Sequence, residues 1–529
     1  MRALPRIALV VLALSLALPA PQAARRVALD EATIADLQAA FQAGTLTAEQ
    51  LVRLYLARIE AYDRQGPALR AVLTLNPKAL DTARALDAER ASRGPRSPLH
   101  GIPIVLKDNF DTADLPTTGG SVLLEGFVPP DDAFVVRRLR DAGAIVLAKV
   151  NMSEFASGAA LSSLGGQSLN PHDPARSPSG SSGGTGVAVA AAFAVFGLGT
   201  DTGGSVRGPS SANGIAGLKP TLGLLSRDGI IPLALSFDTA GPMARSVWDV
   251  AAALGPMTGV DPADPATARS EGRRHADYTT FLKADALKGA RIGVARDFFG
   301  ADADVDWVME SALEAMRQAG ATTVDVRYPK WLLDAKEDLY TSVRWPEFGP
   351  QIADYLKATG PGYPKTLDQL IARSRQFLGT RPDGAVPNPP RWALFAREAG
   401  SGAIDDPRYV AVRDHVLPGV RLVIDGLLQR ERLDAIVYPT SPRRPSLIAG
   451  PPDPPTPSPT NIANLTGYPD LIVPAGFTSD RLPVTISFFG PAFSEPRLLA
   501  LGYAFEQATK TRRLPRHTPA LEDDGITIP

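Results

Sequence analysis

Apolar and polar positions along the chain follow helical and strand-like patterns in turn. Residues 30–63 carry apolar side chains at helical spacing and predict two helices, the second of which begins at a capping box headed by Thr47. A third helix is predicted over about 77–92. The short apolar run 102–106 then predicts a buried strand that ends at Lys107.

The succession of a helix and then a strand recurs further along the chain. The pairs are 132–142 with 144–148, 304–319 with 322–326, and 418–430 with 435–438. Strand-like runs at 471–473 and 484–489 and a helix at 495–509 follow. This alternation predicts an α/β fold, in which a central mixed β-sheet is covered by helices on both faces.

Two stretches interrupt the alternation. The Pro-rich stretch 439–459 predicts a long surface loop, and 327–415 mixes Pro, Trp and Tyr with weak helical patterns that suggest a cap over a site. A chain of 529 residues could hold three or four domains. A boundary at the Pro-rich loop would leave the last strands and helix without a core, so residues 25–529 are predicted to form one large domain.

The N-terminus has a pattern of its own. Two arginines precede an almost continuous apolar run at 7–18, and small, turn-prone residues follow. Residues 1–24 therefore predict a secretory signal peptide, cleaved near Ala23 or Ala24, and export to the periplasm or the medium. The run is shorter than the roughly 20 residues that span a bilayer. An uncleaved anchor and an N-terminal core helix are the alternatives, and the mature chain is predicted to have no membrane span.

Composition limits the chemistry that the chain can use. With 55 Lys+Arg against 56 Asp+Glu the formal net charge is -1, so no nucleic-acid partner is expected. The absence of cysteine excludes disulfides, thiolate metal sites and a cysteine nucleophile. The histidines form no recognisable pair and predict neither a metal site nor a catalytic base; they are His100, His172, His275, His415 and His517. No cofactor is indicated.

The segment from 180 to 223 is unusually rich in glycine, with 12 glycines among its 44 residues. A flexible linker would not contain the solidly apolar run 187–195. We therefore expect a buried helix between two tight loops, at 177–184 and 199–207. Glycine in such loops lets backbone N–H groups converge on an anion.

Ser205 in the second loop is a candidate nucleophile. Gly203 and Gly204 precede it, and their N–H groups could face an oxyanion. A serine hydroxyl needs a base, and a buried lysine can lose its proton near neutral pH. Lys107, at the end of an apolar strand, fits that requirement; its alternative is a structural ion pair with a carboxylate.

Three motifs follow one another at fixed spacing. They are Gly-Ile-Pro-Ile-Val-Leu-Lys-Asp-Asn at 101–109, Ser-Gly-Ser-Ser-Gly-Gly at 179–184, and Gly-Thr-Asp-Thr-Gly-Gly-Ser-Val-Arg at 199–207. Together with the 24-residue spacing between Ser181 and Ser205, they resemble the amidase signature family of serine hydrolases. The signature core spans about 95–250, and the resemblance runs from about residue 34 to 510.

The resemblance implies a Ser–Ser–Lys triad. Ser205 would be the nucleophile that forms an acyl-enzyme, Ser181 the bridging serine after a cis peptide bond, and Lys107 the terminal base in its neutral form. The backbone N–H groups of Thr202, Gly203, Gly204 and Ser205 would form the oxyanion hole, with Ser182, Asp201 and Arg207 in supporting positions. The first loop departs from the family pattern at Ser179, where glycine is usual.

Two competing motifs fit less well. A G-x-S-x-G elbow around Ser182 needs a strand just before it, but 170–178 is polar and broken by proline. Gly197 and Gly199 resemble a dinucleotide-binding loop, but Thr202 stands where the third glycine is needed.

Within the family, the stretches 47–75 and 348–371 are most similar to bacterial peptide amidases. The leading hypothesis is a secreted serine amidase that hydrolyses carboxylic amides, C-terminal peptide amides among them, to an acid and ammonia or an amine. A small-molecule or peptide amide would be its substrate. The alternatives are a glutaminase-type subunit of a tRNA-dependent amidotransferase and a non-catalytic binding protein on the same fold.

Overall fold

The computed structural model describes residues 25–379 and 387–528, so the predicted signal peptide, residues 1–24, lies outside the described residues. An 11-stranded sheet forms the centre of the molecule. In sheet order its strands are β11 (Thr322–Val326), β10 (Arg291–Ala295), β12 (Ala435–Pro439), β14 (Pro483–Phe489), β13 (Asp470–Phe477), β8 (Ala216–Lys219), β9 (Thr239–Ala244), β7 (Phe196–Asp201), β3 (Pro103–Lys107), β4 (Ile145–Val150) and β2 (Val72–Leu75).

The sheet is mixed, as predicted. β10 pairs in parallel with β11 and β12, and β3 pairs in parallel with β4 and β7. The strands between these two groups, from β12 to β7, pair antiparallel. The parallel group around β3 is the part of the sheet that carries the candidate chemistry.

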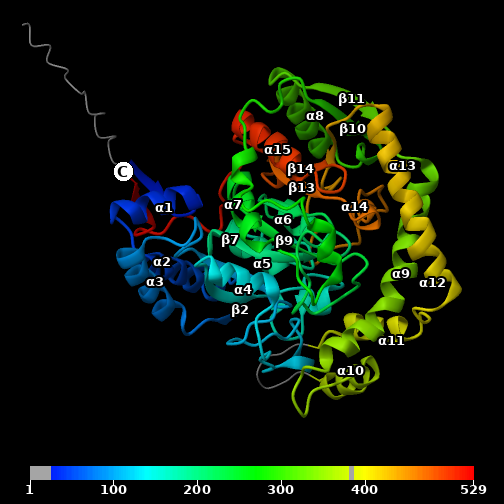
Figure 1. Cartoon of the computed structure of the whole chain (residues 1–529), viewed down its shortest axis with the longest axis horizontal. Helices are drawn as coiled ribbons and strands as arrows, with labels where there is room; N and C mark the ends of the chain where they lie inside the picture. The colour runs from blue at the N-terminus through cyan, green and yellow to red at the C-terminus, as the bar shows by residue number, and fades with distance from the viewer. Residues whose placement is uncertain (1–24, 380–386, 529) are drawn as a thin grey trace, which may run out of the picture.

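Helices cover both faces of the sheet (Figure 1). One face carries α5 (Gly183–Ala190) and α6 (Arg207–Ala212), and the other carries α7 (Val247–Met257), α8 (Ala303–Gln318) and α15 (Glu495–Thr509). Strand β9 shows the division residue by residue. Its Met243 packs with Val189 and Val206, whereas Ala240 and Ala244 join the main core with α7. Alternate side chains of one buried strand therefore serve two helical layers.

The N-terminal helices confirm the sequence pattern. They are α1 (Ile34–Ala43), α2 (Ala48–Ile59), α3 (Ala79–Arg93) and α4 (Phe134–Asp141). At the start of α2 the Thr47 hydroxyl accepts the Gln50 N–H at 3.1 Å, and the Gln50 side chain accepts the Thr47 N–H at 2.9 Å. The pattern did not predict that β1 (Arg25–Ala28) pairs with β15 (Gly525–Ile528) and so joins the two ends of the described chain.

The glycine-rich segment folds differently from the prediction. The buried helix predicted over 187–195 is instead α5, which begins in the first loop at Gly183 and ends at Ala190. The apolar run then continues into β7, so Gly199 to Asp201 belong to a strand and not to the second loop. Helix and strand are both wholly buried, and a run without polar positions has no period that separates them.

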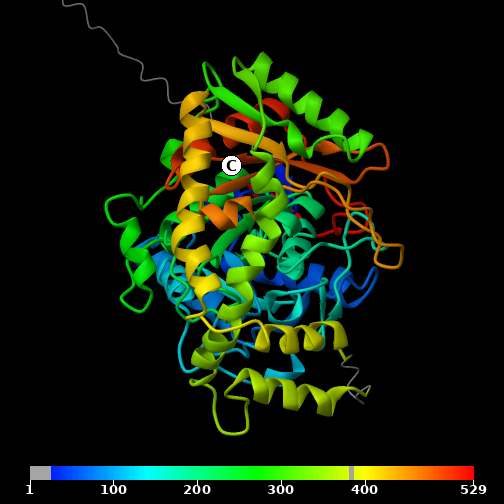
Figure 2. The same ribbon diagram turned by 90° about the vertical axis from the view of Figure 1, so that its right-hand side faces the viewer.

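The stretch 327–415 is more helical than its pattern suggested. It contains α9 (Lys330–Leu356), α10 (Leu367–Ser374), α11 (Pro389–Ala399) and α12 (Pro407–Ala411). Two interior prolines, Pro346 and Pro350, weaken the pattern of the 27-residue α9. The helix runs beside α13 (Leu417–Arg430) along one side of the molecule (Figures 1 and 2). None of the helices in the described part of the chain is long and apolar enough to cross a membrane.

The Pro-rich stretch confirms its prediction. Between β12 and α14 (Ile462–Thr466) the chain forms neither helix nor strand, and a single isolated bridge joins Leu447 to Arg176. Through this bridge the Pro-rich stretch contacts the loop that leads to the first serine motif.

Candidate active site

Two neighbouring parallel strands bring the lysine and serine motifs together. β3 and β7 run side by side with Leu106 opposite Leu198, so their carboxyl ends deliver Lys107 and Thr200 to the same edge. The Lys107 Nζ atom lies 2.7 Å from Thr200 Oγ1 and 2.7 Å from Ser181 Oγ. Residues from all three motifs thus meet around one amino group.

The environment of Lys107 favours a neutral amine. Its side chain is wholly buried and forms no ion pair with any described carboxylate. Burial lowers the pKa of Lys107 to about 7, although the charges of Asp201 and Asp238 partly oppose this shift. The alternative reading of Lys107 as a structural ion-pair partner is therefore wrong.

Ser181 and Ser182 have different surroundings. Ser181 follows a cis peptide bond from Gly180, as the resemblance implied, and its hydroxyl contacts Lys107. The Ser182 hydroxyl is buried between the backbone groups of Thr200: it donates to the carbonyl at 3.2 Å and accepts the N–H at 3.2 Å. Ser182 therefore fastens the loop to β7. It is no nucleophile elbow, since residues 170–178 form no strand.

Ser205 lies in the turn between β7 and α6. Its carbonyl accepts the Ser182 N–H at 3.2 Å, which joins the two serine loops. Ser205 is half-buried, whereas Ser181 and Lys107 are almost completely enclosed. The arrangement leaves Ser205 as the member of the predicted triad that a substrate can reach.

Asp201 folds the turn that carries Ser205. Its carboxylate accepts the N–H groups of Gly204 at 2.8 Å and Val206 at 3.0 Å, the Arg207 Nε–H at 3.1 Å and the Asn464 amide at 2.8 Å. Burial alone would raise the pKa of Asp201, but the Arg207 guanidinium holds it well below its usual range. Asp201 and Arg207 thus hold the turn together through these contacts.

The same contacts correct the predicted oxyanion hole at one position. The Gly204 N–H donates to Asp201 and so is already engaged. The N–H groups of Thr202, Gly203 and Ser205 donate to no acceptor in the part of the chain that the structure describes. These three amides are the ones free to bind an oxyanion.

Comparison with known proteins agrees with this geometry. A family model described as Amidase matches residues 50–499. The chain belongs to the amidase family. This amidase is 34% identical over 504 residues to a probable amidase of Arabidopsis thaliana, with 92% of each chain covered. It is 38% identical to a Glutamyl-tRNA(Gln) amidotransferase subunit of Halorhodospira halophila, over 90% of this chain and 97% of the relative.

Solved structures show the same likeness. The amidase is similar to the native peptide amidase of Stenotrophomonas maltophilia, with a TM-score of 0.85, 42% identity, and coverage of 92% of this chain and 99% of that one. The corresponding Glutamyl-tRNA(Gln) amidotransferase subunit of Thermotoga maritima has a TM-score of 0.70 and 28% identity, with coverage of 92% and 98%. The amidase is thus an amide-hydrolysing enzyme with a single-domain α/β fold.

Three residues that the sequence analysis did not single out contribute to the site. Asn109 donates from Nδ2 to Thr200 Oγ1 at 3.1 Å, and both residues lie inside the recognised motifs. Tyr340 of α9 stacks on Phe237 with ring centroids 5.2 Å apart, and a Cβ at Gly203 would lie 2.7 Å from its Oη atom. Nothing near Tyr340 in the sequence marks this contact, which depends on the path of α9.

The buried histidines of the amidase have structural partners. His172 Nε2 lies 3.1 Å from the Asn213 carbonyl, and burial lowers the pKa of His172 to about 4. His100 Nε2 lies 2.9 Å from the Leu86 carbonyl. Over residues 25–379 and 387–528, no group of His, Asp and Glu is arranged to hold a metal ion.

Two hollows flank the turn that carries Ser205. On one side Asn109, Thr200, Thr202 and Asp238 line a cavity of about 10 Å³, enough for about one water molecule. On the other side a groove of about 210 Å³ opens between the Gly203–Gly204 backbone and the segment 438–460. Only the groove is large enough to admit part of a substrate.

Proposed function

We propose that this amidase hydrolyses carboxylic amides through an acyl-enzyme on Ser205, with Ser181 as proton relay and Lys107 as base. The observation that carries the proposal is the buried Lys107 amine, 2.7 Å from Ser181 and without a carboxylate partner. Such an amine can accept a proton at neutral pH, and a hydroxyl can donate and accept in the same step.

In the acylation step Ser205 Oγ attacks the amide carbonyl carbon while its proton passes to Ser181 Oγ. The Ser181 proton passes in turn to the neutral Lys107 Nζ. The new C–O bond gives a tetrahedral oxyanion, which the free N–H groups of Thr202, Gly203 and Ser205 would stabilise. The C–N bond then breaks as the proton returns through Ser181 to the leaving nitrogen.

Deacylation repeats the steps with water. The water loses its proton through Ser181 to Lys107 and attacks the ester carbonyl. The ester C–O bond to Ser205 breaks, Ser205 recovers a proton, and the carboxylic acid leaves. The triad returns to its starting protonation, so the net reaction is hydrolysis of one amide bond.

The proposed substrates are small carboxylic amides, including C-terminal amides of peptides. The 42% identity with a peptide amidase and the open groove beside Gly203 support this class. A panel of peptide amides, aryl anilides and fatty amides would rank the classes by kcat/KM. A strong preference for fatty amides would overturn the peptide-amide assignment and leave amide hydrolysis in place.

The nucleophile is tested by Ser205→Ala. The variant should lose hydrolysis and covalent labelling by a fluorophosphonate. Ser210→Ala is the matched control, because its buried hydroxyl on α6 has no hydrogen-bond partner among the described residues. Labelling that survives Ser205→Ala would rule out Ser205 as the nucleophile.

A second candidate function is the glutaminase-type subunit of a tRNA-dependent amidotransferase, favoured by the 38% identity with such subunits. That subunit would release ammonia from glutamine for a partner. The purified chain alone, given glutamine and a peptide amide in separate assays, separates the two. Fast ammonia release from the peptide amide alone supports the amidase proposal, and release from glutamine that depends on added partner subunits contradicts it.

We also propose that the enzyme is exported and that its first 24 residues are removed near Ala23 or Ala24. The basic start and the apolar run of this segment support the proposal. N-terminal sequencing of protein from the periplasm or medium tests it. An intact Met1 on exported protein would rule out cleavage.

A further inference from the structure

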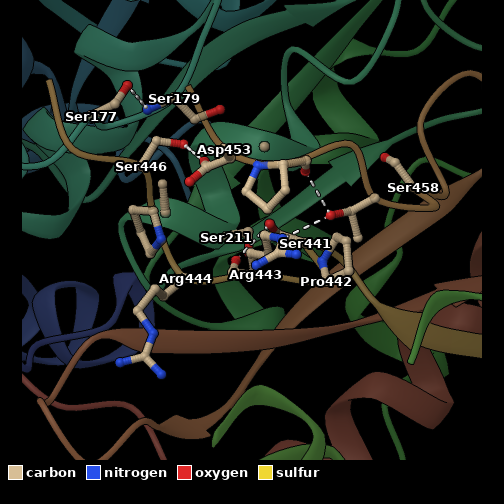
Figure 3. Close-up of a pocket in the computed structure, with 15 residues that line it drawn as sticks. Ser177, Ser179, Ser211, Ser441, Pro442, Arg443, Arg444, Ser446, Asp453 and Ser458 are labelled. Carbon is tan, nitrogen blue, oxygen red and sulfur yellow. Dashed lines mark hydrogen bonds between the residues drawn. The ribbon is translucent and has the colours of Figure 1, made fainter. Parts of the chain in front are cut away.

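A second hollow continues the groove beside the catalytic turn. It has a volume of about 340 Å³, within the range of ligand sites, and Figure 3 shows the residues that line it. The two hollows share Ser179, Gly208, Ser441, Pro442 and Ser458 as walls. The two hollows therefore form one continuous depression that begins beside Gly203 and Gly204, the residues that precede Ser205.

One cation in this second hollow lacks a carboxylate partner. Arg443 donates from Nε to Thr456 Oγ1 at 2.7 Å and forms no ion pair among the described residues. Its neighbour Arg444 forms ion pairs with Asp302 at 2.8 Å and Asp480 at 3.0 Å. In Figure 3 the Arg444 side chain leaves the pocket, whereas the Arg443 guanidinium lies within it.

Other arginines around the groove are also paired. Arg207 contacts Asp201 and Asp470, and Arg176 contacts Asp173. A guanidinium presents five N–H donors in a planar fork that matches a carboxylate. Arg443 therefore keeps its two terminal nitrogens available to a ligand.

Hydroxyl groups add further donors to the same hollow. Ser179 and Ser211 line it, and neither side-chain oxygen has a hydrogen-bond partner in the described part of the chain. Ser179 is also the residue at which the first loop departs from the family pattern. The remaining charge on the walls, Asp453, accepts a hydrogen bond from Ser446 at 2.5 Å and forms no ion pair with Arg443. The Arg443 cation and the two free hydroxyl groups can together bind a ligand that has anionic oxygen atoms.

We propose that this hollow is a subsite for a carboxylate on the acyl part of the substrate, and that Arg443 recognises it. The preferred substrates are then amides that carry an acidic side chain upstream of the scissile amide. This inference rests on the proposed amidase function and narrows its substrate class. Because Arg443 is partly exposed, salt should weaken the preference.

The test compares two substrates that differ only in charge, acetyl-Glu-Leu-amide and acetyl-Gln-Leu-amide. We expect the wild type to show roughly tenfold higher kcat/KM for the glutamate substrate, as one charge-assisted contact provides. Arg443→Gln should bring the ratio close to one. Arg443→Glu should instead favour acetyl-Lys-Leu-amide.

Arg444→Gln is the matched control, because that side chain is held by Asp302 and Asp480 outside the pocket. It should leave the ratio as in the wild type, and Asp453→Asn should raise it. Equal kcat/KM for both substrates in the wild type, or a preference that survives Arg443→Gln, would overturn the inference.

A binding measurement separates failure of the subsite from failure of the proposed function. Calorimetric titration of the Ser205→Ala protein with acetyl-Glu-Leu-amide and acetyl-Gln-Leu-amide needs no turnover. Tighter binding of the glutamate peptide, lost in Ser205→Ala/Arg443→Gln, supports the subsite even if neither compound is hydrolysed. Equal binding overturns the subsite, whatever the activity.

Discussion

Two buried lysines lie on neighbouring strands of the sheet and have opposite surroundings. Lys107 ends β3 and contacts two hydroxyls, those of Ser181 and Thr200. Lys149, on the adjacent β4, forms an ion pair with Asp108 at 3.3 Å and also donates to two backbone carbonyls and a threonine hydroxyl. Both side chains are wholly buried.

The two lysines differ in the groups that they contact and not in how deeply they are buried. Burial lowers the pKa of both lysines, but for Lys149 the adjacent Asp108 charge opposes the shift and pairs with the ammonium. Among the described residues Lys107 contacts only neutral groups, namely the Ser181 and Thr200 hydroxyls and, at 3.5 Å, the Thr200 carbonyl. The hydroxyls can accept from an ammonium or donate to an amine. A buried lysine thus becomes a candidate base where hydroxyls surround it and a structural cation where a carboxylate does.

The largest expected effect is the loss of the base. Lys107→Met should lower kcat/KM by about 10² to 10⁴, the usual contribution of general base catalysis. The melting temperature should stay the same or rise, because no carboxylate loses a partner. Steady-state kinetics and thermal unfolding check both parts. Wild-type rates at every pH in Lys107→Met would contradict the lysine-base mechanism.

The same substitution at Lys149 on β4 should lower the free energy of unfolding and not the catalytic rate. Lys149→Met leaves Asp108 buried without its cation and should cost about 3–5 kcal/mol of unfolding free energy. Denaturant titration measures the loss, and active-site titration gives the rate per folded molecule, which should stay close to wild type. Lys149→Met/Asp108→Asn should recover part of the stability. A variant as stable as the wild type would mean that the two lysines do not differ as described.

A methyl group in the turn that carries Ser205 gives the next effect. The added Cβ of Gly203→Ala would press on Tyr340 and displace the N–H groups proposed to bind the oxyanion. Misplacement of about 1 Å costs roughly 10²-fold in rate. Gly203→Ala/Tyr340→Phe removes the contacting hydroxyl and should regain activity. If the single variant keeps full kcat, Gly203 does not position the turn.

The smallest effect is predicted for the second hydroxyl at Lys107. Thr200→Val removes the oxygen that contacts both Lys107 and Asn109, and we expect a loss of about tenfold in kcat/KM, equivalent to one hydrogen bond of about 1.4 kcal/mol. Thr200→Ser, which keeps the oxygen, should restore most of the rate. Equal losses in both variants would show that packing, not the hydroxyl, is responsible.

The sequence predicted those features of the Lys107 site that depend on short segments of the chain. The apolar run before Lys107 predicted its burial, and the motifs around Ser181 and Ser205 predicted which loops would meet it. Sequence alone could not tell a base from an ion-pair partner, because that depends on how β3 and β7 align. The helix predicted over 187–195 was misplaced because both the helix and the strand after it are wholly buried. Such elements carry no polar residues that would mark where one ends and the next begins.

Regions set by long-range packing were the least predictable. Pro346 and Pro350 concealed α9, whose apolar residues Phe348 and Ile352 belong to one hydrophobic cluster with Phe155 from the segment after β4. The engagement of the Gly204 N–H by Asp201 likewise follows from the folded turn and not from the glycine pattern. Motifs identify which residues meet, and tertiary contacts decide which of their groups stay free.

The most direct test of the central claim is the pH dependence of Ser205 phosphonylation by a fluorophosphonate, measured in wild type and Lys107→Met. Burial lowers the pKa of Lys107 to about 7, and only its neutral form accepts a proton, so the wild-type rate should rise with pH to a plateau, with the midpoint of the rise near pH 7. The Lys107→Met variant should react slowly with the fluorophosphonate, and its rate should not show this rise with pH. The same rise in Lys107→Met, or a wild-type midpoint near 10, would contradict Lys107 as the base.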